Sequence, residues 1–108
     1  MTMLLAQYHL SDTDAIDVLS FSTFTKIRMI IIANANASEV TYSLYFDKGE
    51  GLYSSENVLF NEIALDGDSS DVLEFDAGTF EENNANYKIG CSCNTSDALT
   101  ISIFGDKQ

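Results

Sequence analysis

The stretch Val40-Thr-Tyr-Ser-Leu-Tyr-Phe46 decides the fold class, because its apolar and polar side chains alternate with a period of two. Every even-numbered position is apolar or aromatic, whereas Thr41 and Ser43 fall on the opposite face. The same alternation recurs in Tyr87–Cys93 and in Leu99–Phe104. Successive side chains of a strand point to opposite faces of a sheet, so this pattern predicts half-buried antiparallel strands.

The segment Thr25–Ala33 differs from these strands because one of its faces begins with Lys26 and Arg28 and then becomes apolar, so that its second half is apolar on both faces. Strict alternation places Met29 and Ile31 on one face, and Ile30 and Ile32 on the other. We expect one end of this strand to be covered on both sides. Burial beneath another part of the same chain is the favoured explanation, and cover by a neighbouring subunit or by the N-terminal arm is the alternative.

The weaker strand candidates are Met3–Tyr8, Ala15–Leu19, Val58–Leu65 and Val72–Ala77. The third of them breaks its alternation at Asn61–Glu62, which indicates a β-bulge. A short helix is the alternative there, because Leu59 and Ile63 have i,i+4 spacing. Short strands separated by turn-forming residues predict an all-β fold, a single antiparallel β-sandwich (jelly-roll-like) of about eight strands. The domain spans residues 1–108, with residues 1–10 as a candidate N-terminal arm.

The charge of the chain excludes two classes of partner. Its 108 residues include 17 acidic and only 5 basic side chains, which gives a net charge of −12. Nucleic-acid affinity comes mainly from neutralised phosphates, and anionic membrane surfaces attract basic segments. No apolar run approaches the ~20 residues of a membrane-spanning helix. We therefore expect neither direct nucleic-acid binding nor a membrane partner.

The residues needed for common catalytic and metal sites are also missing. His9 is the only histidine, so no nucleophile–histidine pair is indicated, and a structural or solvent-facing role is expected for it. The segment Asp66–Asp71 begins like a calcium loop but lacks the glycine and the final glutamate of such a loop. Cys91 and Cys93 are expected to be reduced, small apolar residues, as in a protein folded in the cytoplasm. The sequence predicts no enzyme, no cofactor and no metal.

Three stretches combine an apolar strand with an Asn-rich, acidic or Gly-containing turn. They are Lys26–Ser38, Val40–Asp47 and Asn86–Gly105, and the last ends in a Thr-x-x-x-aromatic-Gly pattern. Together they resemble small β-sandwich virion proteins of tailed bacteriophages, although the prolines usual in that family's middle loops are absent. The resemblance implies a non-enzymatic component of the virion, assembled in the host cytoplasm. It leaves open the capsid, the neck, the tail or a fibre.

Two functional hypotheses follow from this resemblance. The first is a capsid decoration (cement) protein, a homo-oligomer with a trimer favoured, that binds the major capsid protein. Its predicted interface residues are Met1, Met3, Leu4, Leu5, Tyr8, Ile30 and Ile32. The second is a tail, neck or fibre component whose loop tips bind a partner protein or a host-surface glycan. Its predicted binding residues are Tyr53, Asn83, Asn84 and Asn94.

Overall fold

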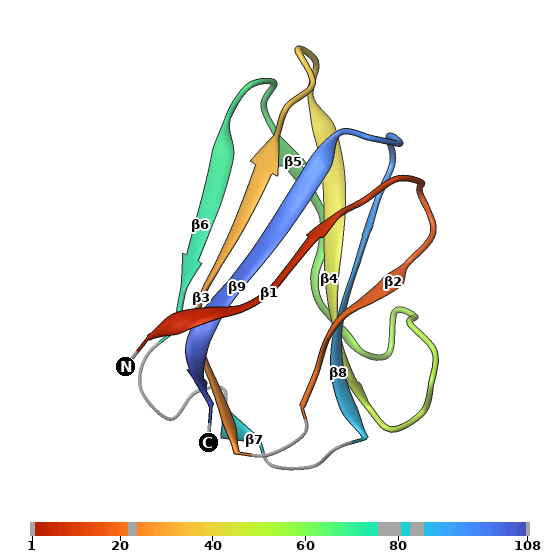
Figure 1. Ribbon diagram of the computed structural model, residues 1–108. Coiled ribbons are helices and arrows are strands. Elements are labelled where there is room, and N and C mark those ends of the chain that lie inside the picture. Colours follow the sequence, from red (N-terminus) through yellow and green to blue (C-terminus); the bar gives the residue numbers. More distant parts are fainter. Residues whose placement is uncertain (1, 22–23, 76–80, 83–85, 108) are drawn as a thin grey trace.

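The computed structural model describes residues 2–21, 24–75, 81–82 and 86–107, and it contains two antiparallel sheets (Figure 1). Eight strands have five to ten residues, and one, β7, has two. The strands are β1 (Met3–His9), β2 (Ile16–Ser20), β3 (Thr25–Asn34), β4 (Val40–Lys48), β5 (Val58–Leu65), β6 (Ser70–Glu74), β7 (Glu81–Glu82), β8 (Tyr87–Cys93) and β9 (Leu99–Lys107). The predicted all-β class is confirmed.

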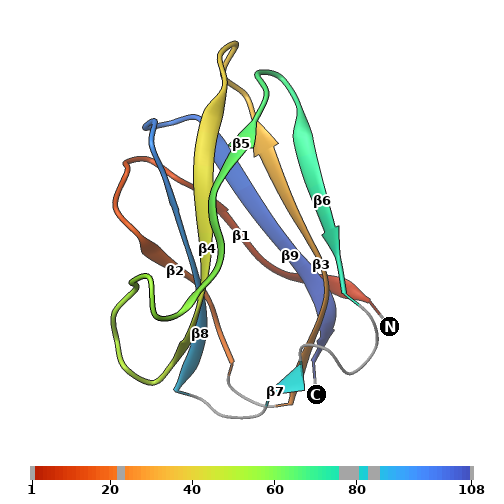
Figure 2. The same cartoon turned by 180° about the vertical axis from the view of Figure 1, so that it is seen from behind.

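The order of the strands is that of a jelly roll. The five-stranded sheet has the order β1-β9-β3-β6, with β7 paired to β3, and the four-stranded sheet has the order β2-β8-β4-β5. If β7 is set aside, the first strand pairs with the last, the second with the seventh, the third with the sixth, and the fourth with the fifth. A long antiparallel hairpin rolled into two layers gives this order. Figures 1 and 2 show the two layers from opposite sides.

The core lies between the two sheets, and the alternation seen in the sequence places it there. Ile101 and Ile103 of β9 are fully buried against Leu44 of β4 and its neighbours in one cluster. Tyr42 of β4 also points inward, and its hydroxyl donates a 2.7 Å hydrogen bond to the carboxylate of Asp71 in β6. This bond joins one sheet to the other and satisfies a polar group that the core would otherwise leave unpaired.

A bulge in β3 reverses the faces that strict alternation predicts for its second half. The pairing of β3 with β9 shifts register between Ile27 and Met29, so the residues after the shift change sides. Ile30 and Ile32 are consequently 0 % exposed and lie in the core. The prediction that they are interface residues is wrong, and burial beneath another part of the same chain accounts for them. Met29 and Ile31 take the outer face instead.

The N-terminal segment is a strand of the sheet. Met3–His9 forms the edge strand β1, which pairs with β9 from Met3–Gly105 to His9–Thr100. Leu10, directly after it, is 2 % exposed. These residues are therefore not a free arm within the subunit. Met1 lies outside the described residues.

The break in Val58–Leu65 is a β-bulge, as one of the two interpretations predicted, and the short-helix alternative is wrong. Tyr42 pairs with Ile63, and the next paired residue, Leu44, faces Phe60, so Asn61 and Glu62 together lie opposite Ser43 and β5 carries one extra residue. Glu62 has a φ of 50°, in the left-handed region that residues other than glycine seldom adopt.

Both cysteines are free and buried, as predicted, with exposures of 0 % for Cys91 and 7 % for Cys93. The described strands and turns contain no helix of the length and apolarity that a membrane span requires. They also contain no group of three or more side chains that would suit a metal ion.

Candidate functional site

The outer face of the five-stranded sheet carries a row of large apolar side chains. The pairings Leu4–Phe104 and Phe104–Met29 place one residue from each of β1, β9 and β3 side by side. Ile31 pairs with Val72 of β6 one step further along the sheet. Directly paired residues share a face, and the inner face here belongs to Ile30 and Ile103. We call Leu4, Met29, Ile31, Val72 and Phe104 the apolar face.

The apolar face crosses all four long strands of the sheet and is partly open to solvent. Leu4 is 50 % exposed and Val72 is 52 % exposed, whereas the three central residues are half-buried. Among the described side chains of these strands, the charged ones near the apolar face lie only at its rim. Arg28 Nε donates to Asp106 Oδ2 at 2.8 Å. This hydrogen bond lowers the pKa of the Asp106 carboxyl below its ordinary value.

The predicted interface residues divide between this face, the sheet edge and the core. Leu4 belongs to the apolar face. Met3 and Tyr8 are 51 % and 42 % exposed at the β1 edge, but their partners Gly105 and Ile101 assign them to the inner rows of the sheet. Leu5, at the register shift of β1, packs against the core.

The periodicity of the sequence does not single out most of the apolar face. Strict alternation marks Met29 and Ile31 only as part of the continuously apolar side of their strand, and it does not mark Val72 and Phe104 as members of an exposed apolar surface. The signal that pointed to them was the apolar character of both faces of Thr25–Ala33. A strand that is apolar on both sides contributes one side to the core and presents the other to something else.

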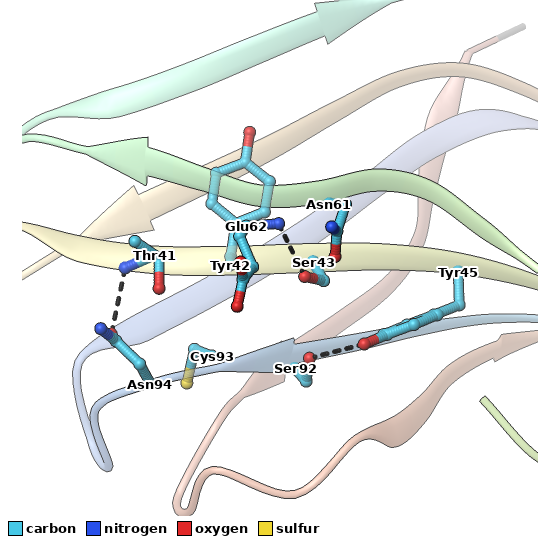
Figure 3. Close-up of a pocket in the computed structure, with 9 residues that line it drawn as sticks. All are labelled: Thr41, Tyr42, Ser43, Tyr45, Asn61, Glu62, Ser92, Cys93 and Asn94. Atoms are coloured by element: carbon cyan, nitrogen blue, oxygen red, sulfur yellow. Dashed lines mark hydrogen bonds between the residues drawn. The ribbon is translucent and has the colours of Figure 1, made fainter. Parts of the chain in front are cut away.

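The outer face of the four-stranded sheet is polar and contains a shallow groove of about 190 Å³ (Figure 3). Strands β4, β5 and β8 and the turn after β8 supply its side chains. We call this the polar groove, and the side chains that define it are Thr41, Ser43, Tyr45, Asn61, Glu62, Ser92 and Asn94. Tyr42 and Cys93 also border it, although their side chains are buried in the core.

Hydrogen bonds fix the floor of the polar groove. The backbone N–H of Glu62 donates to Ser43 Oγ at 2.9 Å, which holds the β5 bulge against β4. The hydroxyls of Tyr45 and Ser92 lie 3.2 Å apart and share a hydrogen bond. The N–H of Thr41 donates to Asn94 Oδ1 at 3.0 Å. Serine and threonine at the outward positions of β4 and β8 supply these short polar groups, as the alternation of the sequence predicts.

The predicted loop-tip residues have two different environments. Asn94 lies in the polar groove. Tyr53 is held against the sheet, because its hydroxyl donates to the Asp17 carboxylate and its ring lies over Gly90, where a Cβ would come within 2.3 Å of it. Burial, then the hydrogen bond to Asp17, raises the pKa of Tyr53 well above its usual range. Asn83 and Asn84 lie outside the described residues.

One arrangement resembles a catalytic triad in its partners but not in its surroundings. His9 Nδ1 lies 3.0 Å from Thr100 Oγ1, and His9 Nε2 lies 3.6 Å from Asp97 Oδ1. The Asp97 side chain is 74 % exposed, and the His9 side chain is 50 % exposed. A nucleophile–base pair needs a desolvated pocket and oxyanion donors, and such an open surface pair supplies neither. The pair links the β8–β9 turn to β1.

The buried thiols are unsuited to nucleophilic chemistry. Burial raises the pKa of the Cys91 thiol to about 12, and the neighbouring Cys93 adds to this effect. Burial also raises the pKa of Cys93. The thiolate is the reactive form of cysteine, so both residues act as small core side chains.

Comparisons with known proteins found similarity only among solved structures. No protein-family model and no curated protein sequence matches the chain. The chain is similar to the Tobacco streak virus coat protein in its C2 crystal form, with 12 % identity and a TM-score of 0.49 over 99 % of this chain and 86 % of that one. For the dimer of the same coat protein the identity is 12 % and the TM-score 0.46, over 100 % and 85 % of the two chains. Such low identity transfers no role to this protein.

Proposed function

We propose that this protein is a non-enzymatic structural component of a virion, specifically a capsid decoration protein that docks on the assembled shell. The observation that carries the proposal is the apolar face. The net charge of −12 is concentrated elsewhere, because the face itself holds five uncharged residues and is bordered by two bases (Lys26, Arg28) and two acids (Glu74, Asp106). A neutral, apolar sheet face on an acidic protein is suited to docking on another protein.

The proposed mechanism is stabilisation by linkage. A protein that binds only the assembled shell shifts the equilibrium toward that state by mass action. Weak contacts repeated over a lattice add up to strong overall attachment. The resemblance of three stretches of the sequence to phage virion proteins supports a shell of this kind. In the proposed trimer, the exposed Met3 and Tyr8 of the open β1 edge would contact a neighbouring copy.

Shells assembled without this protein test the proposal directly. We expect shells to which the purified protein has been added back to rupture at a higher temperature than bare shells, as measured by calorimetry. Serum albumin at the same concentration is the control for nonspecific protein. Equal rupture temperatures with and without the protein would overturn the decoration function.

Substitutions on the apolar face sharpen the test. Leu4 and Val72 are about half exposed, so the double variant Leu4→Ser/Val72→Ser should fold normally. Each substitution should cost about 1 kcal/mol of docking free energy, so the double variant should bind the shell roughly thirtyfold more weakly. The matched control is Leu52→Ser/Leu59→Ser, which removes two apolar side chains of similar exposure (53 % and 42 %) elsewhere on the surface. Equal losses from both double variants would contradict docking through this face.

A tail, neck or fibre component is the alternative assignment, and copy number distinguishes the two. A decoration protein occupies the shell lattice in hundreds of copies, whereas a tail component follows the low symmetry of the tail and is present in far fewer. Densitometry of purified virions, with the major capsid protein as the internal standard, measures this ratio.

A further inference from the structure

The polar groove contains hydrogen-bonding groups that the fold leaves unused. Glu62 makes no side-chain hydrogen bond within the described part of the chain, and neither does Asn61 beside it. Asn94 uses its Oδ1 atom to accept from Thr41 N and Thr95 Oγ1, which leaves its NH₂ group available. A carboxylate and an amide from β5 and a second amide from the turn after β8 thus line one depression (Figure 3).

An aromatic surface lies next to these groups. The ring of Tyr45 is half-buried along the groove, and its hydroxyl is held by Ser92. The ring of Tyr53 packs beside it, with centroids 5.3 Å apart and a tilt of 39°. Tyr53 is itself fixed by Asp17 and by its contact with Gly90. Tyr45 therefore supplies a fixed aromatic ring to the lining of the groove, with Tyr53 packed against it from outside that lining.

We propose that the polar groove binds a neutral hexose residue of a glycan. The Glu62 carboxylate would accept from two adjacent sugar hydroxyls, the Asn61 amide would donate to or accept from others, and the NH₂ group of Asn94 would donate. One apolar face of the sugar ring would pack on Tyr45. This combination of a few fixed polar groups with an aromatic wall is typical of small-molecule sites.

Charge and size narrow the ligand class. None of the described residues that line the groove is a lysine, an arginine or a histidine, Glu62 is acidic, and the whole chain carries a net charge of −12. Sialylated, sulfated and phosphorylated sugars are therefore excluded by repulsion. The volume of about 190 Å³ is below the roughly 300–1,000 Å³ of pockets that enclose drug-sized ligands. We expect one sugar unit to lie in the groove, with a Kd in the millimolar range, about that of other small, open sites.

The backbone at Glu62 gives independent support. A φ of 50° is unfavourable for glutamate, and it places Asn61 and Glu62 together at the groove. Such conformations persist where the surrounding structure fixes them, and they cluster at binding sites. Here the hydrogen bond from Glu62 N to Ser43 Oγ fixes the bulge in place.

The test is an NMR titration of the ¹⁵N-labelled protein with three neutral probes, which are the methyl glycosides of glucose, galactose and N-acetylglucosamine. We expect saturable shifts of the Ser43, Tyr45 and Ser92 amides with at least one probe, and none with glucose 6-phosphate. The proposal would be overturned if no amide shifts at sugar concentrations up to about 50 mM, roughly 50 times a millimolar Kd. It would also be overturned if the only amides that shift lie outside the groove. Equal shifts with the phosphorylated sugar would overturn the predicted ligand class.

Matched variants locate the site. Glu62→Gln keeps the shape of the side chain but removes the carboxylate, and we expect at least a fivefold weaker response. Glu74→Gln makes the same change on an exposed position of β6, beside the apolar face, and should bind as the parent does. Equal binding by all three proteins would remove Glu62 from the site and overturn the proposal. This result is independent of docking through the apolar face, because the two surfaces belong to different sheets.

Discussion

The two outer faces of this sandwich differ in chemistry although the same alternation rule produces both. On the four-stranded sheet, the outward positions of the central strand β4 are Thr41, Ser43 and Tyr45. On the five-stranded sheet, the corresponding central strand β3 presents Met29 and Ile31. Neither set is required to build the core, which already holds the inward residues of both strands. The composition of an outer face therefore reflects what the face contacts.

The comparison separates folding from function in a single strand. Ile30 faces the core and Ile31 faces outward, so neighbouring residues of identical chemistry have different roles. For a face exposed only to water, the outward positions of β3 would be as polar as those of β4. The apolar face and the polar groove belong to different sheets, which lie on opposite sides of the core.

The largest effect on stability should come from Ile30, which faces the core, and not from its outward neighbour Ile31. Ile30→Ala creates a cavity in a fully buried position and should lower the free energy of unfolding by about 2–5 kcal/mol, as measured by urea denaturation. Ile31→Ala should cost about 1 kcal/mol in the free subunit and show its main effect in docking to the shell. Equal destabilisation by the two substitutions would contradict the assignment of the faces.

The next effect concerns the bulge that decides which apolar residues of β3 face the core. A Cβ on Gly105 would lie 1.9 Å from the backbone oxygen of Lys26, so Gly105→Ala forces β9 away from β3. We expect a loss of about 1–3 kcal/mol in thermal or urea unfolding. Gly51→Asn is the control, because that position has open space and a positive φ that asparagine tolerates. Tolerance of Gly105→Ala would indicate a different register at this point.

Much of the fold could be predicted from the sequence because one face of most strands is polar. Tyr87–Cys93 was predicted with its observed bounds, and Val40–Phe46 and Leu99–Phe104 with the observed starts. The break at Asn61–Glu62 was also identified as a bulge, since two polar residues interrupt a regular pattern. In each case a polar residue fixed the phase of the alternation.

The apolar face could not be predicted in the same way, because the second half of Thr25–Ala33 has apolar residues on both faces. A one-residue shift in such a strand exchanges two equally apolar sets, so the sequence gives no preference between them. The register shift next to Gly105 decides the outcome, and it depends on a partner strand far along the chain. The polar groove was missed for a related reason, since it combines β4, β5 and β8, which the sequence separates.

A smaller effect concerns the core between the two sheets. The protonated side chains of Cys91 and Tyr42 are buried there, so the stability of the fold should depend on alkaline pH. Burial raises the pKa of Cys91 to about 12 from an ordinary value of 9.0. Burial, then the hydrogen bond to Asp71, raises the pKa of Tyr42 well above its ordinary value of 10.0. The unfolded chain loses these protons first, so stability is intact below about pH 9 and falls as the pH rises further. Urea midpoints measured between pH 8 and pH 11 test this sign.

Two variants divide the alkaline effect. Cys91→Ala should reduce the loss of stability with rising pH just above pH 9, and Tyr42→Phe should reduce that loss above pH 10. At neutral pH, Tyr42→Phe should also cost about 1 kcal/mol, because it removes the hydrogen bond that joins the sheets. Stability that rises or stays constant from pH 8 to pH 11 would show that these groups are not protected from the solvent in the folded state.

The smallest effect on stability is expected at Glu62, where the change matters for binding. Glycine adopts a φ of 50° without strain, so Glu62→Gly should leave the free energy of unfolding unchanged or raise it by about 0.5 kcal/mol. The same substitution should abolish the response to neutral sugars. Asp68→Gly is the matched control, with a φ of 54° in the turn between β5 and β6, and it should keep that response. A loss of more than about 1 kcal/mol in Glu62→Gly would mean that the side chain is retained for folding, and the strained bulge would then give no support to a binding site.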